Sequence, residues 1–547
     1  MTLRRLARGL APVALFVLLT AVMTWPQVTR LSTAAVPHPD VYFNMWRFGW
    51  VAHALATPSA RLLDANIFHP ERRTLTFSDA MPVESAVATP LLWAGLPPVL
   101  VHNLVLLAGI AFSGAGMFVL ARRLTGSAAA GVTAGFIFAF APYRFEHYMH
   151  MELQWTIWTP WAFWALDRTF ETARIRDGVL VGVFVALQFL SSIYYGAFLA
   201  TLLGLVVLVL SCPLRGRALT SRLAAVALGG GVALVLAAPY ALQYAITKNK
   251  AGGRPVNQVL MFSAKPTSYT VATDTNLLYG ERSEKRGRAE RRLFPGVLPL
   301  LLAVAGLLLR PPTVQAMAFL IALVAAFELS LGFYGYSYPL LYRHVPIFEG
   351  LRAPARFGIY AVFFLAVLAA YGHAAIAAAL GGQGAPRRLR AHLLAGVIGA
   401  CLMLEYWVAP LKLIAYPNTA PPLYTWLAGQ PRGVVAELPL SPPDLLPGTD
   451  PRYAYLSTFH WMPMINGYSG YYPPSYLDRV HRLRHFPADP TTHILQAAGV
   501  RYVIVHMTAY SPDEGAAVLT ELGFNFAYTQ LGTFADGQGR AVVYSLK

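Results

Sequence analysis

Long apolar stretches recur through the first three quarters of the chain, separated by short polar or basic segments. A helix needs about 20 apolar residues to cross a hydrocarbon core of about 30 Å. Lipid offers the backbone no partners, so such segments must be helical. The pattern therefore predicts eleven membrane-spanning helices, at 10–28, 99–121, 126–142, 153–170, 178–194, 196–211, 223–244, 294–310, 313–331, 357–379 and 392–411.

Two long polar segments, 29–98 and 245–293, interrupt the spans. The first combines aromatic and apolar residues at helical spacing, which is typical of short helices that lie at the membrane interface. After residue 411 proline becomes frequent, and the β-like runs VVAELPL, RYVIVH and AVVYSL accompany a helix-like THILQAAG that ends at Gly499. We predict a mainly α, polytopic transmembrane bundle over 1–411 and a small extracytoplasmic α/β domain over 412–547.

The composition supports a membrane protein. The 547 residues are 56% hydrophobic and 13% charged, which excludes an ordinary soluble protein. A net charge of +17 would suggest nucleic acid in a soluble chain, but most of the cations lie between spans, where topology and anionic lipids explain them better. We therefore predict membrane lipids, and no nucleic acid, among the partners.

The distribution of arginine predicts the orientation. With the N-terminus in the cytoplasm, the short outer loops hold only Arg144, Arg343, Arg352 and Arg356. The short inner loops then hold Arg4, Arg5, Arg8, Arg122, Arg123, Arg168, Arg174, Arg176, Arg215, Arg217, Arg222, Arg310, Arg387, Arg388 and Arg390. This asymmetry predicts a cytoplasmic N-terminus and an outer C-terminal domain.

The N-terminal run MTLRRLARGLAPVALFVLLTAVMTWP has a basic start and an apolar core. We interpret it as a retained signal-anchor rather than a cleaved signal peptide, because no clear small-residue cleavage site follows closely. Cys212 and Cys401 are the only cysteines, and CxxC, CxxCH and HExxH patterns are absent. These observations exclude a disulfide framework, thiol redox chemistry, c-type haem and the zincin class.

Asp40 follows the first predicted span closely, in the run HPDVYFNMWRFGWVAHAL. A carboxylate near the bilayer surface suits a general base, or a group that orients an acceptor hydroxyl. The alternative is a helix cap, which His38-Pro39-Asp40 also fits. His53 is a substrate contact or an interfacial polar residue. Glu84, in TFSDAMPVESAV, either faces Asp40, directly or through a divalent ion, or begins a helix after a turn.

The outer loop PYRFEHYMHMELQW gathers charged and imidazole side chains at a membrane face. His147 and His150 would share one side of a helix, and with Glu146 they suit a metal site, a hydrated polar cluster or a place beside a polar substrate. Arg144 stands in the same loop and is a further candidate for phosphate binding. Trp155 opens a series of tryptophans that anchor the interface and pack helices, or offer a platform to a sugar or lipid.

The segment VPIFEGLRAPARFG places Arg352 and Arg356 four residues apart, just before a span. Guanidinium groups grip phosphate oxygens bidentately; the alternative is a pair of snorkelling arginines. Lys265 could join the same pocket, whereas GERSEKRGRAERR is interpreted as a solvated charge run. Tyr468 and Tyr471 lie in FHWMPMINGYSGYYPPSY, whose aromatic and turn residues suit carbohydrate contact or a packed loop.

Taken together, these segments resemble the GT-C superfamily of membrane glycosyltransferases, in the broad group with the bacterial YfhO-like proteins. The resemblance is carried by Asp40 in the first outer loop, RFEHYMHMELQW before a Trp/Pro-rich span, LFPG and LRAPARFG beside late spans, and NGYSGYYPPSY in the outer domain. It implies sugar transfer from a polyprenyl-phosphate-linked donor to an acceptor outside the cytoplasm. It also implies that Asp40 is the catalytic carboxylate and that Arg352 and Arg356 bind phosphate.

One departure concerns the paired acid that is frequent in the first loop of this superfamily. Here Val41 and Tyr42 follow Asp40, so Glu146 or Glu84 would supply the second acid, or none is needed. This leaves a divalent metal ion open as a cofactor.

We therefore predict a multi-pass glycosyltransferase of the bacterial inner membrane, transferring a hexosyl or pentosyl group to a glycan, lipid or protein acceptor. A lipid-linked donor follows because an outer site has no supply of nucleotide sugars, and no GxGxxG or P-loop is present. The alternatives are a transporter or lipid flippase, disfavoured by spans that hold few ionisable residues, and a non-catalytic membrane assembly protein.

Overall fold

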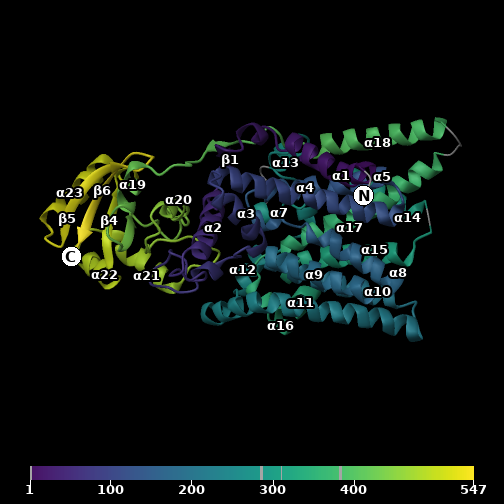
Figure 1. Cartoon of the computed structure of the whole chain (residues 1–547), viewed down its shortest axis with the longest axis horizontal. Helices are drawn as coiled ribbons and strands as arrows, with labels where there is room; N and C mark the ends of the chain where they lie inside the picture. The colour runs from purple at the N-terminus through teal and green to yellow at the C-terminus, as the bar shows by residue number, and fades with distance from the viewer. Residues whose placement is uncertain (1–2, 284–287, 310, 381–384) are drawn as a thin grey trace. The chain divides into compact units, whose positions relative to one another are not determined.

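The computed structural model describes residues 3–283, 288–309, 311–380 and 385–547 (Figure 1). The predicted inner-loop residue Arg310, and Lys285 and Arg286 of the second outer segment, lie outside the described residues. The chain forms two compact units: unit 1 comprises Met1–Thr29 and Leu104–Leu411, and unit 2 comprises Arg30–Asn103 and Lys412–Lys547. The first outer segment therefore shares a unit with the C-terminal residues.

All eleven predicted spans coincide with helices of the structure. These helices are α1 (Leu3–Met23), α4 (Pro98–Thr125), α5 (Ala128–Phe140), α8 (Trp158–Thr172), α9 (Ile175–Ser191), α10 (Ile193–Ser211), α11 (Gly216–Ala251), α14 (Val297–Leu308), α15 (Val314–Ser330), α17 (Gly358–Ala379) and α18 (Ala385–Glu405). Short helices connect them: α6 (Pro142–Glu146), α7 (Met151–Gln154), α12 (Val256–Met261), α13 (Gly280–Ser283) and α16 (Ser337–His344).

Within the described residues, five helical stretches are long and apolar enough to cross a membrane: Pro98–Thr125, Ala128–Glu146, Ile193–Ser211, Gly216–Lys250 and Pro354–Ala379. Leu10–Met23, Val297–Leu308 and Val314–Ser330 are apolar but shorter. The predicted mainly α, multi-pass membrane fold is confirmed.

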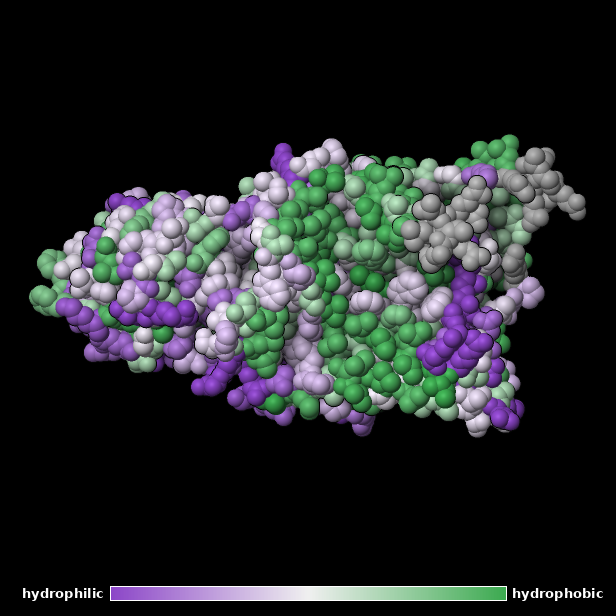
Figure 2. Space-filling model, in the orientation of Figure 1, coloured by the Kyte–Doolittle hydropathy of each residue, from purple (hydrophilic) through white to green (hydrophobic). Residues whose placement is uncertain are grey.

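The outer surfaces of these helices are apolar. Leu234 and Val235 on α11 and Leu308 on α14 are 72%, 73% and 79% exposed. Figure 2 shows hydrophobic residues over much of the visible face of the helices of unit 1. A contiguous apolar surface of this kind is unfavourable in water and favourable against lipid.

The helices of unit 1 approach one another closely where glycines face each other. A Cβ added at Gly182 of α9 would lie 1.9 Å from the carbonyl oxygen of Gly229 on α11, and one added at Gly178 would lie 2.1 Å from that of Ala225. Gly178 and Gly182 have the small-xxx-small spacing that brings helix backbones together in membranes. In Figure 1, α17 lies among the helices of unit 1, and it contacts α5, α14 and α15.

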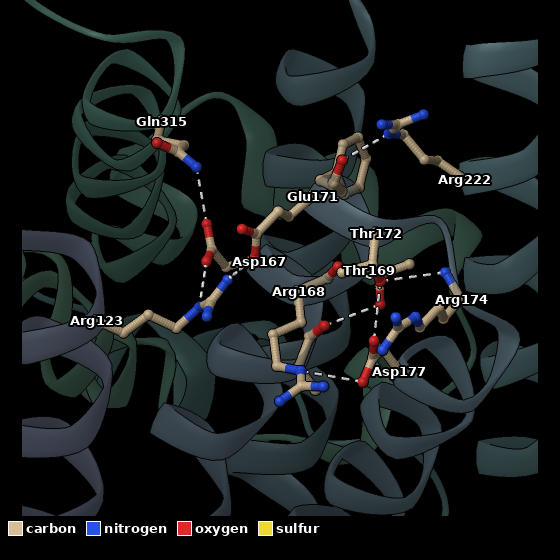
Figure 3. A network of polar contacts seen from close by, with 12 residues as sticks. Arg123, Asp167, Arg168, Thr169, Glu171, Thr172, Arg174, Asp177, Arg222 and Gln315 are labelled. Carbon is tan, nitrogen blue, oxygen red and sulfur yellow. Dashed lines mark hydrogen bonds and ion pairs between the residues drawn. The ribbon is translucent and has the colours of Figure 1, made fainter.

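A polar network links the C-terminal half of α8 to neighbouring helices (Figure 3). Asp167 on α8 accepts a hydrogen bond from Nε of Arg123 on α4 at 2.6 Å and one from Gln315 on α15 at 2.8 Å. Arg168 donates to Asp177 on α9 at 3.1 Å. Because these residues stand at the C-terminal half of α8, the network lies at the opposite end of that helix from the loop 141–157.

Unit 2 contains a four-stranded sheet in the order β3 (Val434–Leu438), β4 (Val500–His506), β6 (Arg540–Leu546), β5 (Tyr528–Ala535). The β3–β4 pair is parallel and the other two pairs are antiparallel. The three predicted β-like runs are strands, and α22 (Asp489–Ala497) ends before Gly499 at a φ of 68°. Strand β5 was not predicted from the sequence, because it is largely exposed and carries few apolar residues.

A two-stranded antiparallel pair, β1 (Ala34–Ala35) with β2 (Ile414–Ala415), joins the two parts of the chain that form unit 2. Its helices are α2 (Pro39–Ala56), α3 (Pro82–Trp93), α19 (Pro422–Ala428), α20 (Asp450–Leu456), α21 (Pro474–Arg482), α22 and α23 (Pro512–Phe524). The structure does not give α2 the exposed face of an interfacial helix. Val41, Trp46 and Phe48 are buried, and α2 packs on α20 as a core helix of unit 2.

Candidate functional site

Three segments far apart in the sequence meet in unit 1 through buried polar side chains. His147 follows α6, Glu290 lies on η4 (Ala289–Arg291), and Arg356 lies on η7 (Pro354–Phe357). Nη2 and Nε of Arg356 donate to Oε1 of Glu290 at 2.7 and 3.2 Å, and Nε2 of His147 lies 3.6 Å from Oε2 of the same carboxylate. All three side chains are largely buried, so the cluster fixes the loops on which they stand.

The protonation states of this cluster follow from its surroundings. Burial by itself raises the pKa of Glu290, but the charge of Arg356 and its hydrogen bonds to the carboxylate outweigh this effect, and the pKa lies well below its usual value. Burial lowers the pKa of His147 to about 3, despite the opposing effect of Glu290. At neutral pH the cluster is therefore an ion pair between Glu290 and Arg356 beside a neutral imidazole. The ring of His150 lies 5.6 Å from that of His147.

A second ion-pair group contains Glu146. Nη1 of Arg292 lies 3.2 Å from Oε2 of Glu146 and 2.9 Å from Oδ2 of Asp274. Burial lowers the pKa of Arg292, but Glu146 and Asp274 raise it above its usual value, so the guanidinium is firmly charged. Glu146 is thus a partner of a cation in this structure.

Arg352 and Arg356 both contact Tyr194. The backbone N–H of Arg352 donates to the Tyr194 hydroxyl at 2.8 Å, and the guanidinium of Arg356 lies 4.8 Å from the centre of the Tyr194 ring. Within the described residues the Arg352 guanidinium makes no hydrogen bond or ion pair, and it stands 5.2 Å from the Phe262 ring. Among the residues that the structure describes, Glu290 therefore neutralises Arg356, whereas no acid pairs with Arg352.

Arg144 is buried inside its own loop, with 1% of its surface exposed. Its Nε donates to the Phe138 carbonyl at 2.6 Å, Nη1 to the Gln154 carbonyl at 3.2 Å, and Nη2 to the Thr156 hydroxyl. The guanidinium closes the loop between α5 and α8. These contacts leave it little capacity to grip a phosphate.

Lys265 and Trp155 are also placed in unit 1. Lys265 is exposed, with Nζ 5.4 Å from the centre of the Tyr334 ring. The indole N–H of Trp155 donates to the Val105 carbonyl at 3.0 Å, and its ring fills the space that a Cβ at Gly109 would need. Trp155 therefore packs the loop against α4. This is the packing role that was weighed against a platform for a sugar or lipid.

In unit 2, Asp40 stands in the first turn of α2, but the residue that caps this helix is His38. Nδ1 of His38 accepts the backbone N–H of Asp40 at 3.1 Å, and Pro39 occupies the first helical position. The Asp40 carboxylate instead accepts a hydrogen bond from the Tyr468 hydroxyl, while 14% of the side chain stays exposed. The Tyr468 ring packs edge-on against Phe43, at 4.9 Å between centres. The two predicted residues Asp40 and Tyr468 are thus brought together.

The other predicted residues of unit 2 are spread over its first segment and its aromatic loop. His53 stacks on Trp461, with ring centres 4.3 Å apart and planes 11° apart. Glu84 is fully buried in the first turn of α3. The ring of Tyr471 packs edge-on against Phe77 at 5.4 Å.

Glu290 and Arg292 were not predicted as site residues, because they lie in GERSEKRGRAERR, which was interpreted as a solvated charge run. No pattern in those letters distinguishes a buried acid from an exposed one. Within the described parts of the chain, no group of three or more His, Cys, Asp or Glu side chains could hold a metal ion. Asp40 belongs to unit 2 and the arginines to unit 1, so their convergence on one substrate stays a prediction.

No protein-family model matches the sequence, and no curated protein matches it significantly. Solved structures do match. The arabinofuranosyltransferase AftD from Mycobacteria matches all of the chain at 15% identity and a TM-score of 0.62, although the chain spans only 40% of AftD. The oligosaccharyltransferase AglB from Archaeoglobus fulgidus, in complex with an inhibitory peptide and a dolichol-phosphate, matches 98% of the chain at 13% identity and 0.54, over 75% of its own length. Its apo form gives 14% identity and 0.54, over 97% of the chain and 75% of AglB.

Proposed function

Because the chain has the fold of the GT-C superfamily of membrane glycosyltransferases, we propose that it is an integral membrane glycosyltransferase. It moves a sugar from a polyprenyl-phosphate-linked donor to an acceptor on the outer face of the membrane. The observation that carries the proposal is the position of Asp40. This acid lies in the first turn of α2, in the segment that follows the first apolar helix of the chain. The YfhO-like grouping and the bacterial inner membrane remain predictions.

Asp40 is suited to act on an acceptor hydroxyl. One carboxylate oxygen is held by the Tyr468 hydroxyl, which fixes the direction of the group. The partial exposure of the side chain leaves it accessible to a substrate. Asp40 then orients the hydroxyl and takes its proton as the hydroxyl oxygen attacks the anomeric carbon of the donor, and the lipid phosphate departs with the bonding electrons. Displacement from the opposite face inverts the configuration at the sugar carbon.

The departing phosphate needs cations, since negative charge develops on it in the transition state. Arg352 supports this role because its guanidinium has no counter-charge among the described residues. Arg356 is held rigidly by Glu290, and its contribution is a fixed position beside Tyr194 rather than a free charge. Glu146, paired with Arg292, serves the loop rather than a metal ion in this proposal.

The test is sugar transfer in proteoliposomes that contain polyprenyl-phosphate-linked pentose and hexose donors. We expect wild-type protein to release polyprenyl phosphate and Asp40→Asn to lose at least about a hundredfold of that rate. Asp478→Asn is the matched control, because Asp478 is an exposed acid in the same unit, and its rate should equal the wild-type rate. Full activity of Asp40→Asn would overturn the assigned role.

A further inference from the structure

A groove of about 640 Å³ opens on unit 2 at the C-terminal end of α2, and no residue in it has a role in the transfer proposed above. Its aromatic wall consists of Trp50, His53 and Trp461. The ring of His53 stacks on that of Trp461, and the Trp50 ring lies 5.8 and 5.9 Å from these two rings. A volume of this size holds a ligand of several rings.

Trp461 occupies its position at a conformational cost. Its φ is 53°, in the left-handed region that bulky residues rarely adopt. Its carbonyl accepts a hydrogen bond from Nη2 of Arg432 at 2.9 Å. Its ring lies close to Gly49, where an added Cβ would be 3.4 Å from the indole. Within the described residues its indole N–H makes no hydrogen bond. Backbone strain of this kind is concentrated at binding and catalytic sites, which makes Trp461 a candidate ligand contact.

The polar rim of the groove carries both signs of charge. Arg61, Arg72 and Arg432 line it together with the carboxylates of Asp64 and Glu71, and Arg432 is exposed. Asp64 accepts the backbone N–H of Arg73 at 2.9 Å, and Glu71 accepts the Ser475 hydroxyl at 2.6 Å, so both acids are held in place. Mixed charges disfavour a polyanion and a polar rim disfavours a lipid chain. A carbohydrate suits the combination, because its ring face is apolar and its hydroxyls both donate and accept.

We propose that this groove binds a stretch of a carbohydrate acceptor at a distance from the hydroxyl that reacts; the inference rests on the proposed function. His53 follows Asp40 by thirteen residues on α2, which corresponds to about 20 Å along the helix axis. The two side chains project from different sides of the helix. The acceptor is therefore a flexible chain of several sugar residues, of which one end reaches Asp40 and a later portion stacks on Trp461.

Binding is measured first, with the full chain in nanodiscs and an array of defined pentose and hexose oligosaccharides of one to eight residues. We expect longer chains to bind and monosaccharides not to bind. Trp461→Ala should weaken binding of the best chain by about tenfold, the share of one aromatic contact, whereas Trp461→Phe should retain most of it. Phe526→Ala, which removes an exposed aromatic elsewhere in unit 2, should bind like wild type. Thermal unfolding checks that each variant is folded.

The outcomes separate this inference from the proposed function. Asp40→Asn should bind the same oligosaccharides while transferring nothing. If the wild-type protein binds them and Trp461→Ala does not, but the wild-type protein transfers no sugar, the binding groove is supported and the proposed enzymatic function is overturned. If no oligosaccharide binds, or if a peptide or a phospholipid vesicle binds in a Trp461-dependent manner instead, the carbohydrate groove is overturned. Should Trp461→Ala not fold, Arg432→Ala and His53→Ala provide the same comparison.

Discussion

Nη2 of Arg356 donates to Oε1 of Glu290 at 2.7 Å, although the two residues are 66 positions apart in the sequence. The contact joins η7, which begins a long apolar helix, to η4, which lies in the long polar segment before α14. His147 adds its imidazole from a third loop. Removing the two charges from water costs free energy that offsets most of their attraction. The pair therefore adds little net stability, although breaking it by removing one partner is costly.

Removing one partner of this pair should destabilise the protein strongly. Glu290→Gln leaves the Arg356 guanidinium buried without its counter-charge, for which we expect a loss of about 3–5 kcal/mol in unfolding free energy. The measurement is the thermal unfolding of the full chain in detergent. Asp478→Asn breaks the exposed pair with Arg482, whose side chains are 63% and 56% exposed, and should cost about 0–1 kcal/mol. Equal shifts for the two variants would contradict the buried ion pair.

Arg352 should separate activity from stability. Because its guanidinium has no partner among the described residues, Arg352→Ala should leave the unfolding temperature close to that of wild type. Transfer should fall by about a hundredfold if the cation stabilises the departing phosphate. The proteoliposome assay measures the rate, with Arg343→Ala as an exposed arginine control. Unchanged transfer by Arg352→Ala would remove it from the phosphate site.

The close approach of α9 and α11 predicts a difference between two glycines of the same helix. A Cβ at Gly229 would lie 2.1 Å from the Gly178 carbonyl, whereas a Cβ at Gly231 meets nothing within 4 Å. Gly229→Leu should therefore force the helices apart and cost about 1–3 kcal/mol or more, while Gly231→Leu should be tolerated. Thermal unfolding of the two variants in detergent is the comparison. A similar loss at both positions would show that helix propensity, not packing, decides.

The sheet of unit 2 should lose stability in mild alkali. Burial lowers the pKa of His506, but hydrogen bonds from its ring to Asp536 and Glu437 raise it to about 9. The unfolded value is about 6.5, so the stabilisation is complete below that pH and is lost as pH rises through about 9. The pKa of Asp536 is lowered, so its contribution persists across this range.

The measurement is the unfolding temperature between pH 6 and pH 10. We expect it to fall by several degrees in wild type, since each pKa unit corresponds to about 1.4 kcal/mol. His506→Gln should be less stable at pH 6 and should show a flatter profile. A profile in wild type as flat as that of the variant would mean that His506 is neutral in the folded state.

Local patterns predicted much of the fold. Each of the eleven apolar runs overlaps a helix, because a helix satisfies its backbone hydrogen bonds within the segment itself. Within the described residues, five of the helical stretches are long and apolar enough to cross a membrane. The runs at Val434–Leu438, Val500–His506 and Arg540–Leu546 are strands for a similar reason, since they are buried on both faces and rich in β-branched residues. Strand β5 was not predicted because all of its residues except Tyr528 are exposed or partly exposed, and it carries few apolar residues.

The candidate site was predicted less completely. Asp40 and Arg352 were singled out by position next to a span, and both have accessible polar groups in the structure. Arg144 drew attention for the same reason, yet its donors are used within its own loop. Glu290 gave no signal, because its burial depends on His147 and Arg356 from distant segments.

The sequence by itself determined which long apolar segments are helices and where the polar loops fall, because these properties depend on the residues of each segment. Only the tertiary structure decided that Arg30–Asn103 joins Lys412–Lys547 in one unit, that His38 rather than Asp40 caps α2, and that Tyr468 reaches Asp40. The physical reason is that a hydrogen bond or an ion pair requires its partner at about 3 Å. Residues hundreds of positions apart acquire that distance only when the chain packs.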